Sequence, residues 1–239
     1  MILFDYGHTL LYEPDFNSLS GEEALFMYIK NNRNNLTPKQ VNDFSQELFS
    51  KIGSIRDIGL EIHERQFQRF LYEYLEIELS ISLSEAETVF WDNTSAGAVM
   101  PNADRIIEYV NENGIRSGVI SNIGFSGEAL TWRLNRLLPQ NRFEFVIASS
   151  EYMFRKPCPM LFEIALKKAG LYADDVWYCG DNIKADVEGA ATVGILPVWY
   201  EDDTVENPWR YKNHGMFPNC EHLHINDWLE LIKVLECCI

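Results

Sequence analysis

The first ten residues of the chain, Met1 to Leu10, read MILFDYGHTL. The apolar run at residues 1–4 predicts a short buried strand, and Asp5 stands where that strand gives way to a turn containing Gly7. Open α/β sheets place their chemistry at the carboxyl ends of strands. Asp5 is therefore the first candidate for a functional carboxylate, although an aspartate at a strand end also forms turns without any further role.

Composition limits the partners of this chain. It has 239 residues with a formal net charge of −16, which argues against nucleic acid as a partner because phosphate contacts need a basic face. A phosphate-bearing ligand must instead be attracted by local positive charge or by a metal. No apolar run approaches the roughly 20 residues of a membrane span, and residues 1–10 do not resemble a secretory signal, so we expect a cytoplasmic protein without membrane association. The five cysteines lack the CxxC spacing of zinc sites.

Two patterns divide the sequence. Residues 14–95 contain several amphipathic helical patterns and no convincing strand, which predicts an all-helical insertion that forms a lid or cap. From residue 98 onward, short apolar runs alternate with helical stretches, which predicts βαβ units and a parallel sheet. The expected strands lie at 117–121, 143–148, 176–179 and 195–200. The predicted class is thus α/β, with a discontinuous core domain of residues 1–13 and 96–239 and a cap domain of residues 14–95.

Four polar clusters follow predicted strands. They lie at residues 5–9, 121–122, 155–157 and 180–186. The carboxyl ends of parallel strands meet at one edge of a sheet, so we expect these clusters to converge. The convergence would bring together carboxylates, hydroxyls and an ammonium group, which suits phosphoryl transfer: an aspartate can attack phosphorus, a hydroxyl and an ammonium can hold the phosphoryl oxygens, and paired carboxylates favour Mg²⁺.

These clusters resemble a known family. Asp5-x-x-x-Thr9, Ser121, Lys156-Pro157 and Gly180-Asp181-x-x-x-x-Asp186 are similar, in order and strand placement, to the four motifs of the haloacid dehalogenase-like hydrolase superfamily. The insertion resembles the helical cap of its first subfamily. The resemblance implies a Rossmann-like core and a Mg²⁺-dependent, phosphatase-type hydrolase. Such an enzyme would cleave a small phosphorylated metabolite through an aspartyl-phosphate intermediate on Asp5.

The same resemblance implies roles for individual residues. Asp5 would be the nucleophile, while Thr9, Ser121, Asn122 and Lys156 would contact the phosphorylated substrate, with Lys156 neutralising its charge. Mg²⁺ would be bound by Asp5, by the backbone carbonyl of Gly7 and by Asp181. Asp186 would act behind these ligands, orienting metal-bound waters or Lys156. A monomer and a homodimer are both compatible with the sequence.

One position departs from the family pattern. Phosphatases of the superfamily carry a second aspartate two residues after the nucleophile as general acid and base, and here that position is Gly7. The loss of such a group typically costs about 10²–10⁴-fold in rate. Intact metal-site motifs argue against a dehalogenase, and three alternatives stay open.

The first alternative is a phosphatase or phosphotransferase whose substrate has a good leaving group, or in which His8 supplies the missing proton transfer. The second is a phosphonatase-like carbon–phosphorus hydrolase that uses Lys30, Lys39 or Lys51 of the cap as a Schiff base. The third is a catalytically weak protein that binds a phosphorylated ligand or another protein.

Overall fold

The central sheet has six parallel strands and places Asp5 near its middle. The computed structural model describes residues 1–208 and 210–238, and the sheet order is β10-β9-β8-β1-β6-β7. The strands are β1 (Ile2–Phe4), β6 (Ser117–Ser121), β7 (Val146–Ala148), β8 (Trp177–Gly180), β9 (Leu196–Tyr200) and β10 (Leu223–Ile225). Strand β1 lies between β6 and β8, so residues that follow these three strands meet at one edge. The predicted α/β class with a parallel sheet is confirmed.

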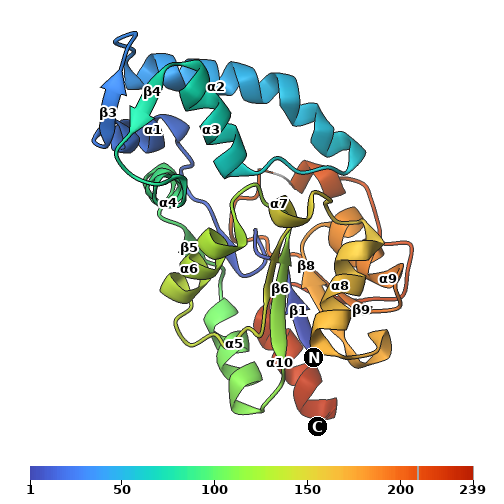
Figure 1. Cartoon of the computed structure of the whole chain (residues 1–239). Coiled ribbons are helices and arrows are strands. Elements are labelled where there is room, and N and C mark those ends of the chain that lie inside the picture. The colour runs from blue at the N-terminus through green and yellow to red at the C-terminus, as the bar shows by residue number, and fades with distance from the viewer. Residues whose placement is uncertain (209, 239) are drawn as a thin grey trace.

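Helices cover both faces of this sheet (Figure 1). They are α5 (Ala103–Glu112), α6 (Gly127–Leu137), α7 (Ser149–Tyr152), α8 (Pro159–Ala169), α9 (Gly189–Ala191) and α10 (Trp228–Cys238). Ile2 and Phe4 point into the cluster that holds Trp228, whereas Leu3 points into the opposite cluster with Phe162. The strand is buried on both faces, which explains why it reads as a continuous apolar run.

Shorter elements complete the core. Three of them are η2 (Ala173–Asp175), the π-helical turn η3 (Ile183–Glu188) and η4 (Arg210–Asn213). The expected strand at 143–148 is shorter than predicted, because only its last three residues pair with β6. Among the described residues, we find no helix with the length and apolar character needed to cross a bilayer.

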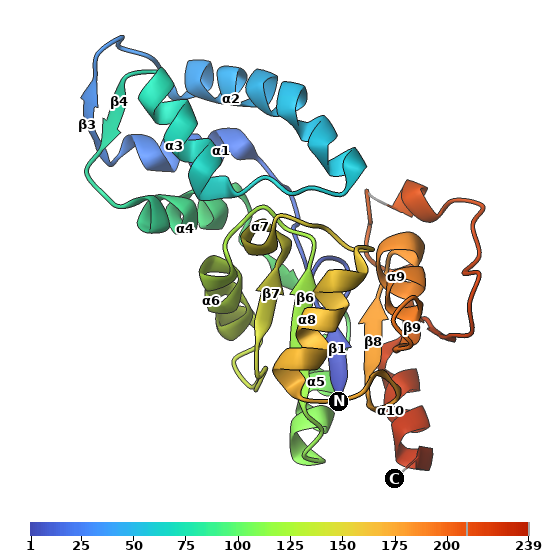
Figure 2. The ribbon, with the colours of Figure 1, turned by 45° about the vertical axis from the view of Figure 1, so that its right-hand side comes forward.

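The inserted segment forms a separate layer above the carboxyl edge of the sheet (Figures 1 and 2). Its helices are α1 (Ser18–Phe26), α2 (Pro38–Ile52), η1 (Gly53–Ile58), α3 (Glu64–Tyr74) and α4 (Leu83–Thr94). The prediction that this insertion is all-helical is wrong in one respect, because β3 (Ile29–Asn32) and β4 (Ile77–Leu79) form an antiparallel ribbon. Both strands are short and β3 is largely polar, so neither produces a strand periodicity in the sequence.

The two connections between core and insertion lie side by side. β2 (Leu11–Tyr12) leads into the insertion and pairs antiparallel with β5 (Ala98–Val99), which leaves it. Arg133 of α6, fully buried, binds Glu13 on the first connection at 2.8 Å and donates to the carbonyl of Ser95 on the second. We base on this pairing our proposal that the cap domain comprises residues 14–95.

Candidate active site

Lys156 lies at the centre of the site. Its Nζ is 2.6 Å from Oδ1 of Asp5, 2.6 Å from Oδ1 of Asp186 and 2.9 Å from the carbonyl oxygen of Ile120. The Tyr178 hydroxyl also lies 2.6 Å from this Nζ. Burial disfavours the charge of Lys156, but Asp186 and Asp5 together raise the pKa of the ammonium above its usual value. The ammonium is thus a fixed positive charge beside Asp5.

Three carboxylates converge at the same point. One oxygen from each of Asp5, Asp181 and Asp186 lies within 4.8 Å of the others. Burial raises the pKa of Asp5 to about 6, against the opposing effect of Lys156. Burial, followed by the charges of Asp186 and Asp5, holds the pKa of Asp181 well above its usual range. Crowded, buried carboxylates of this kind fit a divalent cation. Their oxygens are the ligands that Mg²⁺ prefers, and the charge of the cation would reduce the repulsion between them.

Neighbouring residues hold two of these three carboxylates in place. A Cβ at Gly180 would lie 2.4 Å from Cγ of Asp186, so only glycine fits where the aspartate folds back against β8. The Asn182 backbone amide donates to Oδ2 of Asp186 at 2.9 Å. Asn207 donates from its side chain to Oδ2 of Asp181 at 2.9 Å, and Asn213 donates to the backbone carbonyl of Asp181 at 2.8 Å. The two asparagines, which the motif spacing does not indicate, orient Asp181 from the segment after β9.

The two hydroxyl residues follow or end a core strand, with Thr9 in the turn between β1 and β2 and Ser121 at the end of β6. Thr9 is fully buried, and within the described part of the chain its Oγ1 has no hydrogen-bond partner. A buried hydroxyl without a partner is costly, and a bound phosphoryl oxygen would satisfy it. Ser121 is the last residue of β6 and is also buried. Both residues therefore stand where the sequence places them, at the edge that holds Asp5.

Asn122 acts on Lys156 through the backbone. Its amide nitrogen donates to the carbonyl of Lys156 at 2.9 Å, and its amide oxygen accepts from the Lys156 backbone N–H at 2.7 Å. This two-point contact ties the loop after β6 to the segment that carries the lysine. The structure thus gives Asn122 a positioning contact in addition to the substrate contact expected from the sequence.

Space exists beside Gly7. A Cβ built on this residue would meet no atom within 4 Å, so the position that carries an aspartate in related phosphatases is open. His8, the next residue, lines a small pocket together with Asp181. The Nδ1 atom of His8 is buried and has no hydrogen-bond partner in the described ranges, and burial lowers the pKa of the imidazole.

The cap touches the core directly beside the segment that precedes Lys156. Leu60 and Phe154 form an antiparallel bridge, in which the Arg155 backbone N–H donates to the carbonyl of Gly59 at 2.9 Å. The Glu61 N–H donates to the carbonyl of Met153 at 2.7 Å. These contacts place the segment after η1 over the residues that precede Lys156.

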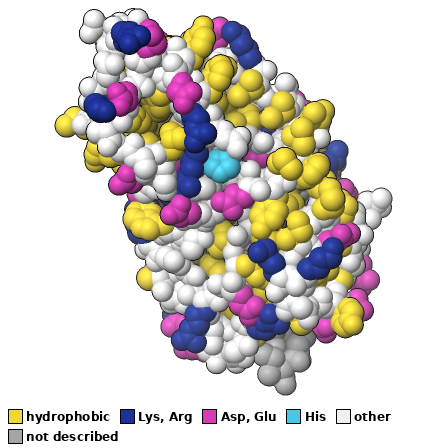
Figure 3. Space-filling model, viewed as in Figure 1, with side chains coloured by type: hydrophobic (Ala, Val, Ile, Leu, Met, Phe, Trp, Pro, Cys, Tyr) yellow, Lys and Arg dark blue, Asp and Glu magenta, His cyan; other side chains and the backbone are white. Residues whose placement is uncertain are grey.

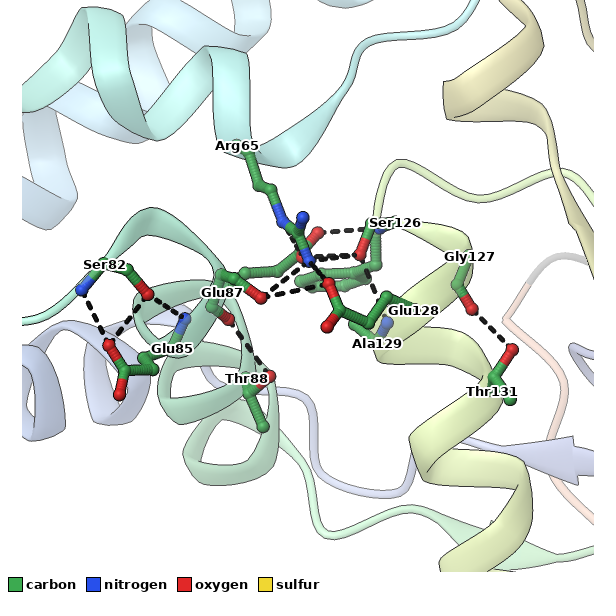
Figure 4. A network of polar contacts seen from close by, with 12 residues as sticks. Arg65, Ser82, Glu85, Glu87, Thr88, Ser126, Gly127, Glu128, Ala129 and Thr131 are labelled. Carbon is green, nitrogen blue, oxygen red and sulfur yellow. Dashed lines mark hydrogen bonds and ion pairs between the residues drawn. The ribbon is translucent and has the colours of Figure 1, made fainter.

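A second contact joins the cap to α6 (Figure 4). Arg65 of α3 donates from Nε to the buried carboxylate of Glu87 at 2.7 Å, and from Nη2 to Ser126 at 3.0 Å and Glu128 at 2.7 Å. Glu87 in turn accepts from both the backbone N–H and the hydroxyl of Ser126 at 2.7 Å. The network fastens α3 and α4 of the cap to the N-terminal end of α6.

The three lysines considered for Schiff-base chemistry lie on the surface of the cap and not at the site. Lys30, Lys39 and Lys51 are exposed, and each forms an ion pair on the cap surface, with Glu78, Asp43 and Glu47 respectively. A Schiff-base lysine needs a desolvated setting that lowers the pKa of its ammonium group. The surface positions of these lysines argue against the phosphonatase-like alternative.

Fold and site together define an α/β protein that carries three convergent carboxylates and a lysine at the carboxyl edge of its sheet, next to a helical insertion. Residues 60–199, more than half of the chain, match the family model described as haloacid dehalogenase-like hydrolase. The chain therefore belongs to this family.

Curated relatives include phosphatases. A glyceraldehyde 3-phosphate phosphatase of Pyrococcus abyssi is 27% identical over 55% of this chain and 56% of its own length. The aligned part thus spans little more than half of that protein. A ribulose-1,5-bisphosphate 5-phosphatase of Halopiger xanaduensis is 24% identical over 84% of each chain.

Solved structures share the fold. A phosphatase of this family from Thermococcus onnurineus superposes with a TM-score of 0.62 at 20% identity, covering 98% of this chain and 96% of its own. A 2-haloacid dehalogenase from Pseudomonas syringae gives a TM-score of 0.63 at 19% identity, covering 100% and 98%. One fold thus serves both chemistries, so the reaction must be argued from the residues of the site.

Proposed function

We propose that this protein is a Mg²⁺-dependent phosphatase that cleaves a small phosphorylated metabolite through an aspartyl-phosphate intermediate on Asp5. One observation carries the proposal: three carboxylates lie within 4.8 Å of one another, and Lys156 joins two of them. The named relatives act on phosphorylated compounds of three and five carbons, which supports a substrate of similar size.

Each residue has a distinct task in the proposed reaction. Asp5 attacks phosphorus through a carboxylate oxygen, the bond from phosphorus to the leaving oxygen breaks, and water then releases phosphate from Asp5. Thr9 and Ser121 donate hydrogen bonds to the phosphoryl oxygens, and Lys156 neutralises their charge. This assignment agrees with the buried Thr9 hydroxyl, which otherwise lacks a partner.

The metal would be held by Asp5, the backbone carbonyl of Gly7 and Asp181. Mg²⁺ at this position supplies positive charge to the nucleophile and the phosphoryl group alike. Asp186 is better placed to orient Lys156, because one of its oxygens contacts Nζ and the other accepts the Asn182 backbone N–H. The family resemblance implies the same role for Asp186, which is to orient Lys156 without binding the metal.

Gly7 shapes the choice of substrate. Without an aspartate at this position, the leaving group must depart with little help from an acid. We therefore propose an acyl or aryl phosphate, or another compound with a good leaving group, as the preferred substrate type. His8 is the alternative proton carrier, because it lines a small pocket together with Asp181. Unchanged turnover in a His8→Gln variant would exclude this role.

The first experiment measures phosphate release from para-nitrophenyl phosphate with Mg²⁺ and with a chelator. We expect release that requires the metal, disappears in Asp5→Asn and persists in Asp174→Asn, a control at an exposed carboxylate distant from the site. Loss of release should be accompanied by loss of the aluminium-fluoride or beryllium-fluoride adduct. A folded, metal-loaded protein that releases no phosphate would contradict the proposal and favour ligand binding without catalysis.

A further inference from the structure

Positive charge accumulates beside the site in an otherwise acidic protein. Arg56 comes from η1 of the cap, Arg155 directly precedes Lys156, and Lys212 comes from η4. Elsewhere, on the face that Figure 3 shows, basic side chains are scattered and mixed with acidic ones. A concentration of three cations from three separate segments is therefore a local feature of the site.

The two arginines share one carboxylate. Arg56 Nε lies 2.7 Å from Oε1 of the buried Glu61, and Arg155 Nη1 binds its other oxygen. One negative charge therefore faces two guanidinium groups, which leaves an excess positive charge. The side chains of Arg56 and Arg155 are 31% and 18% exposed, so this excess charge is only partly screened by water.

Arg56 is held in place and keeps terminal donors available. Its guanidinium carbon lies 4.9 Å from the ring centre of Phe49, and its Nε is bound to Glu61. In the ranges 1–208 and 210–238, no hydrogen bond uses its Nη1 or Nη2. Nη2 lies 3.1 Å from the point that a Cβ on Gly124 would occupy, which places it over the loop that follows Ser121.

The cations act on one another and on the reaction centre. Burial lowers the pKa of Arg155, and the charge of Arg56 lowers it further, while Glu61 and Asp5 oppose this shift. The pKa of Lys212 is lowered first by burial, then by Arg155, with Asp181 opposing. All three cations thus share one region with Asp5 and Asp181. In the proposed reaction, Lys156 and a metal would serve the transferred phosphoryl group, so these further charges suit a different part of the ligand.

We infer that the substrate carries a second anionic group, a carboxylate or a phosphate, which binds to Arg56 and Arg155 beneath the cap. This inference rests on the proposed phosphatase function and narrows its substrate class. The second group would take hydrogen bonds from guanidinium donors that are already oriented by Glu61 and Phe49. Charge-assisted, pre-oriented contacts of this kind are the strong ones in ligand recognition.

Two pairs of compounds test the inference: the members of each pair share one phosphate ester, and one member carries an additional anionic group in place of an alcohol. Glycerol 3-phosphate is compared with 3-phosphoglycerate, and ribulose 5-phosphate with ribulose 1,5-bisphosphate. We expect kcat/KM to be about tenfold or more higher for the member with the extra anion. The first pair reports a carboxylate as the second group and the other a phosphate.

Variants of Arg56 test whether the two arginines cause this preference. Arg56→Gln should reduce kcat/KM for the compound with the additional anionic group by about tenfold more than for its partner with a single phosphate, mainly through KM. Arg56→Lys should restore part of the loss, and Arg69→Gln, an exposed cap arginine, should have no effect. Equal losses for both members of each pair, or a wild-type preference for the members with a single phosphate and no other anion, would overturn the inference.

Binding to Asp5→Asn separates this inference from the proposed reaction. Titration calorimetry with 3-phosphoglycerate and glycerol 3-phosphate needs no turnover. Tighter binding of 3-phosphoglycerate, weakened by Arg56→Gln, would support the second-anion site even if the wild type releases no phosphate, an outcome that would overturn the phosphatase function alone. Equal binding of the two compounds, in a wild type that does release phosphate, would overturn the second-anion site alone.

Discussion

The hydroxyl oxygen of Tyr178 lies 2.6 Å from Nζ of Lys156 and 2.9 Å from the carbonyl oxygen of Ile120. Tyr178 belongs to β8, is fully buried and also approaches Asp186 at 3.3 Å. The phenol therefore joins the lysine to strand β6 through the carbonyl of Ile120. Its sequence context, an apolar run, gives no sign of this polar contact.

Tyr178→Phe should lower kcat about tenfold without a matching change in KM, because Lys156 keeps its charge but loses one of the contacts that orient it. The free energy of unfolding should fall by about 1 kcal/mol for the lost hydrogen bonds. Steady-state kinetics and urea unfolding measure the two effects. Tyr172→Phe, at an exposed tyrosine, is the control, and an unaltered kcat in Tyr178→Phe would contradict the positioning role.

Gly7→Asp should increase turnover of alkyl phosphates by about 10²-fold, because a carboxyl group would enter the open space and protonate poor leaving groups. Rates across a series of aryl and alkyl phosphates should become less dependent on the leaving-group pKa. Gly7→Asn offers the same shape without an exchangeable carboxyl proton. If the asparagine variant gained as much as the aspartate variant, shape rather than proton transfer would be responsible.

Removal of Arg65 should loosen the cap. Arg65→Gln leaves the buried Glu87 carboxylate with only Ser126 as a hydrogen-bond donor. We expect the free energy of unfolding to fall by about 2 kcal/mol. This is below the usual cost of breaking a buried ion pair, because the Arg65 side chain is 26% exposed. The melting temperature should fall by roughly 6 °C. Adding Glu87→Gln to this variant should recover part of the loss, whereas an additive double mutant would show that the pair is not coupled.

Glu22 should make stability depend on pH. Burial raises the pKa of this cap carboxyl to about 7, against the hydrogen bond donated by the Tyr72 hydroxyl at 2.8 Å. The folded state then holds a proton that the unfolded state releases near pH 4.5, so the stability contribution of Glu22 is present at low pH and is lost as pH rises towards 7. The full loss corresponds to about 3 kcal/mol.

The difference between wild type and Glu22→Gln isolates this effect, because other titrating groups contribute to both proteins. Unfolding by urea at pH 5 and pH 8 should show the glutamine variant gaining stability relative to wild type at the higher pH. Glu23→Gln, at the neighbouring exposed position, is the control. A stability difference that stays constant between the two pH values would contradict the raised pKa.

The sheet and its motif residues could be predicted because each signal is local. Strands buried on both faces read as apolar runs, and a polar residue after such a run marks the functional edge, as at Asp5 and Ser121. The ribbon in the cap escaped prediction because β3 and β4 are too short and mixed to show a period.

The supporting residues of the site were missed for another reason. Tyr178 reads as core, while Asn207 and Asn213 lie in a long segment without a motif. The pairing of Arg56 and Arg155 through Glu61 joins cap to core, and only the folded chain brings these residues together. Sequence spacing reports where the reacting groups stand, but not what holds them.

The pairing of β2 with β5 makes the cap a module. Because the chain leaves and re-enters the core on adjacent antiparallel strands, Tyr12 lies opposite Ala98, and a short turn could join them while the six-stranded sheet keeps every strand. Such a turn would leave the strands intact but would remove Glu61, the carboxylate that binds Arg155 next to Lys156. Continuity of the sheet is therefore independent of the insertion, whereas the surroundings of Lys156 depend on it.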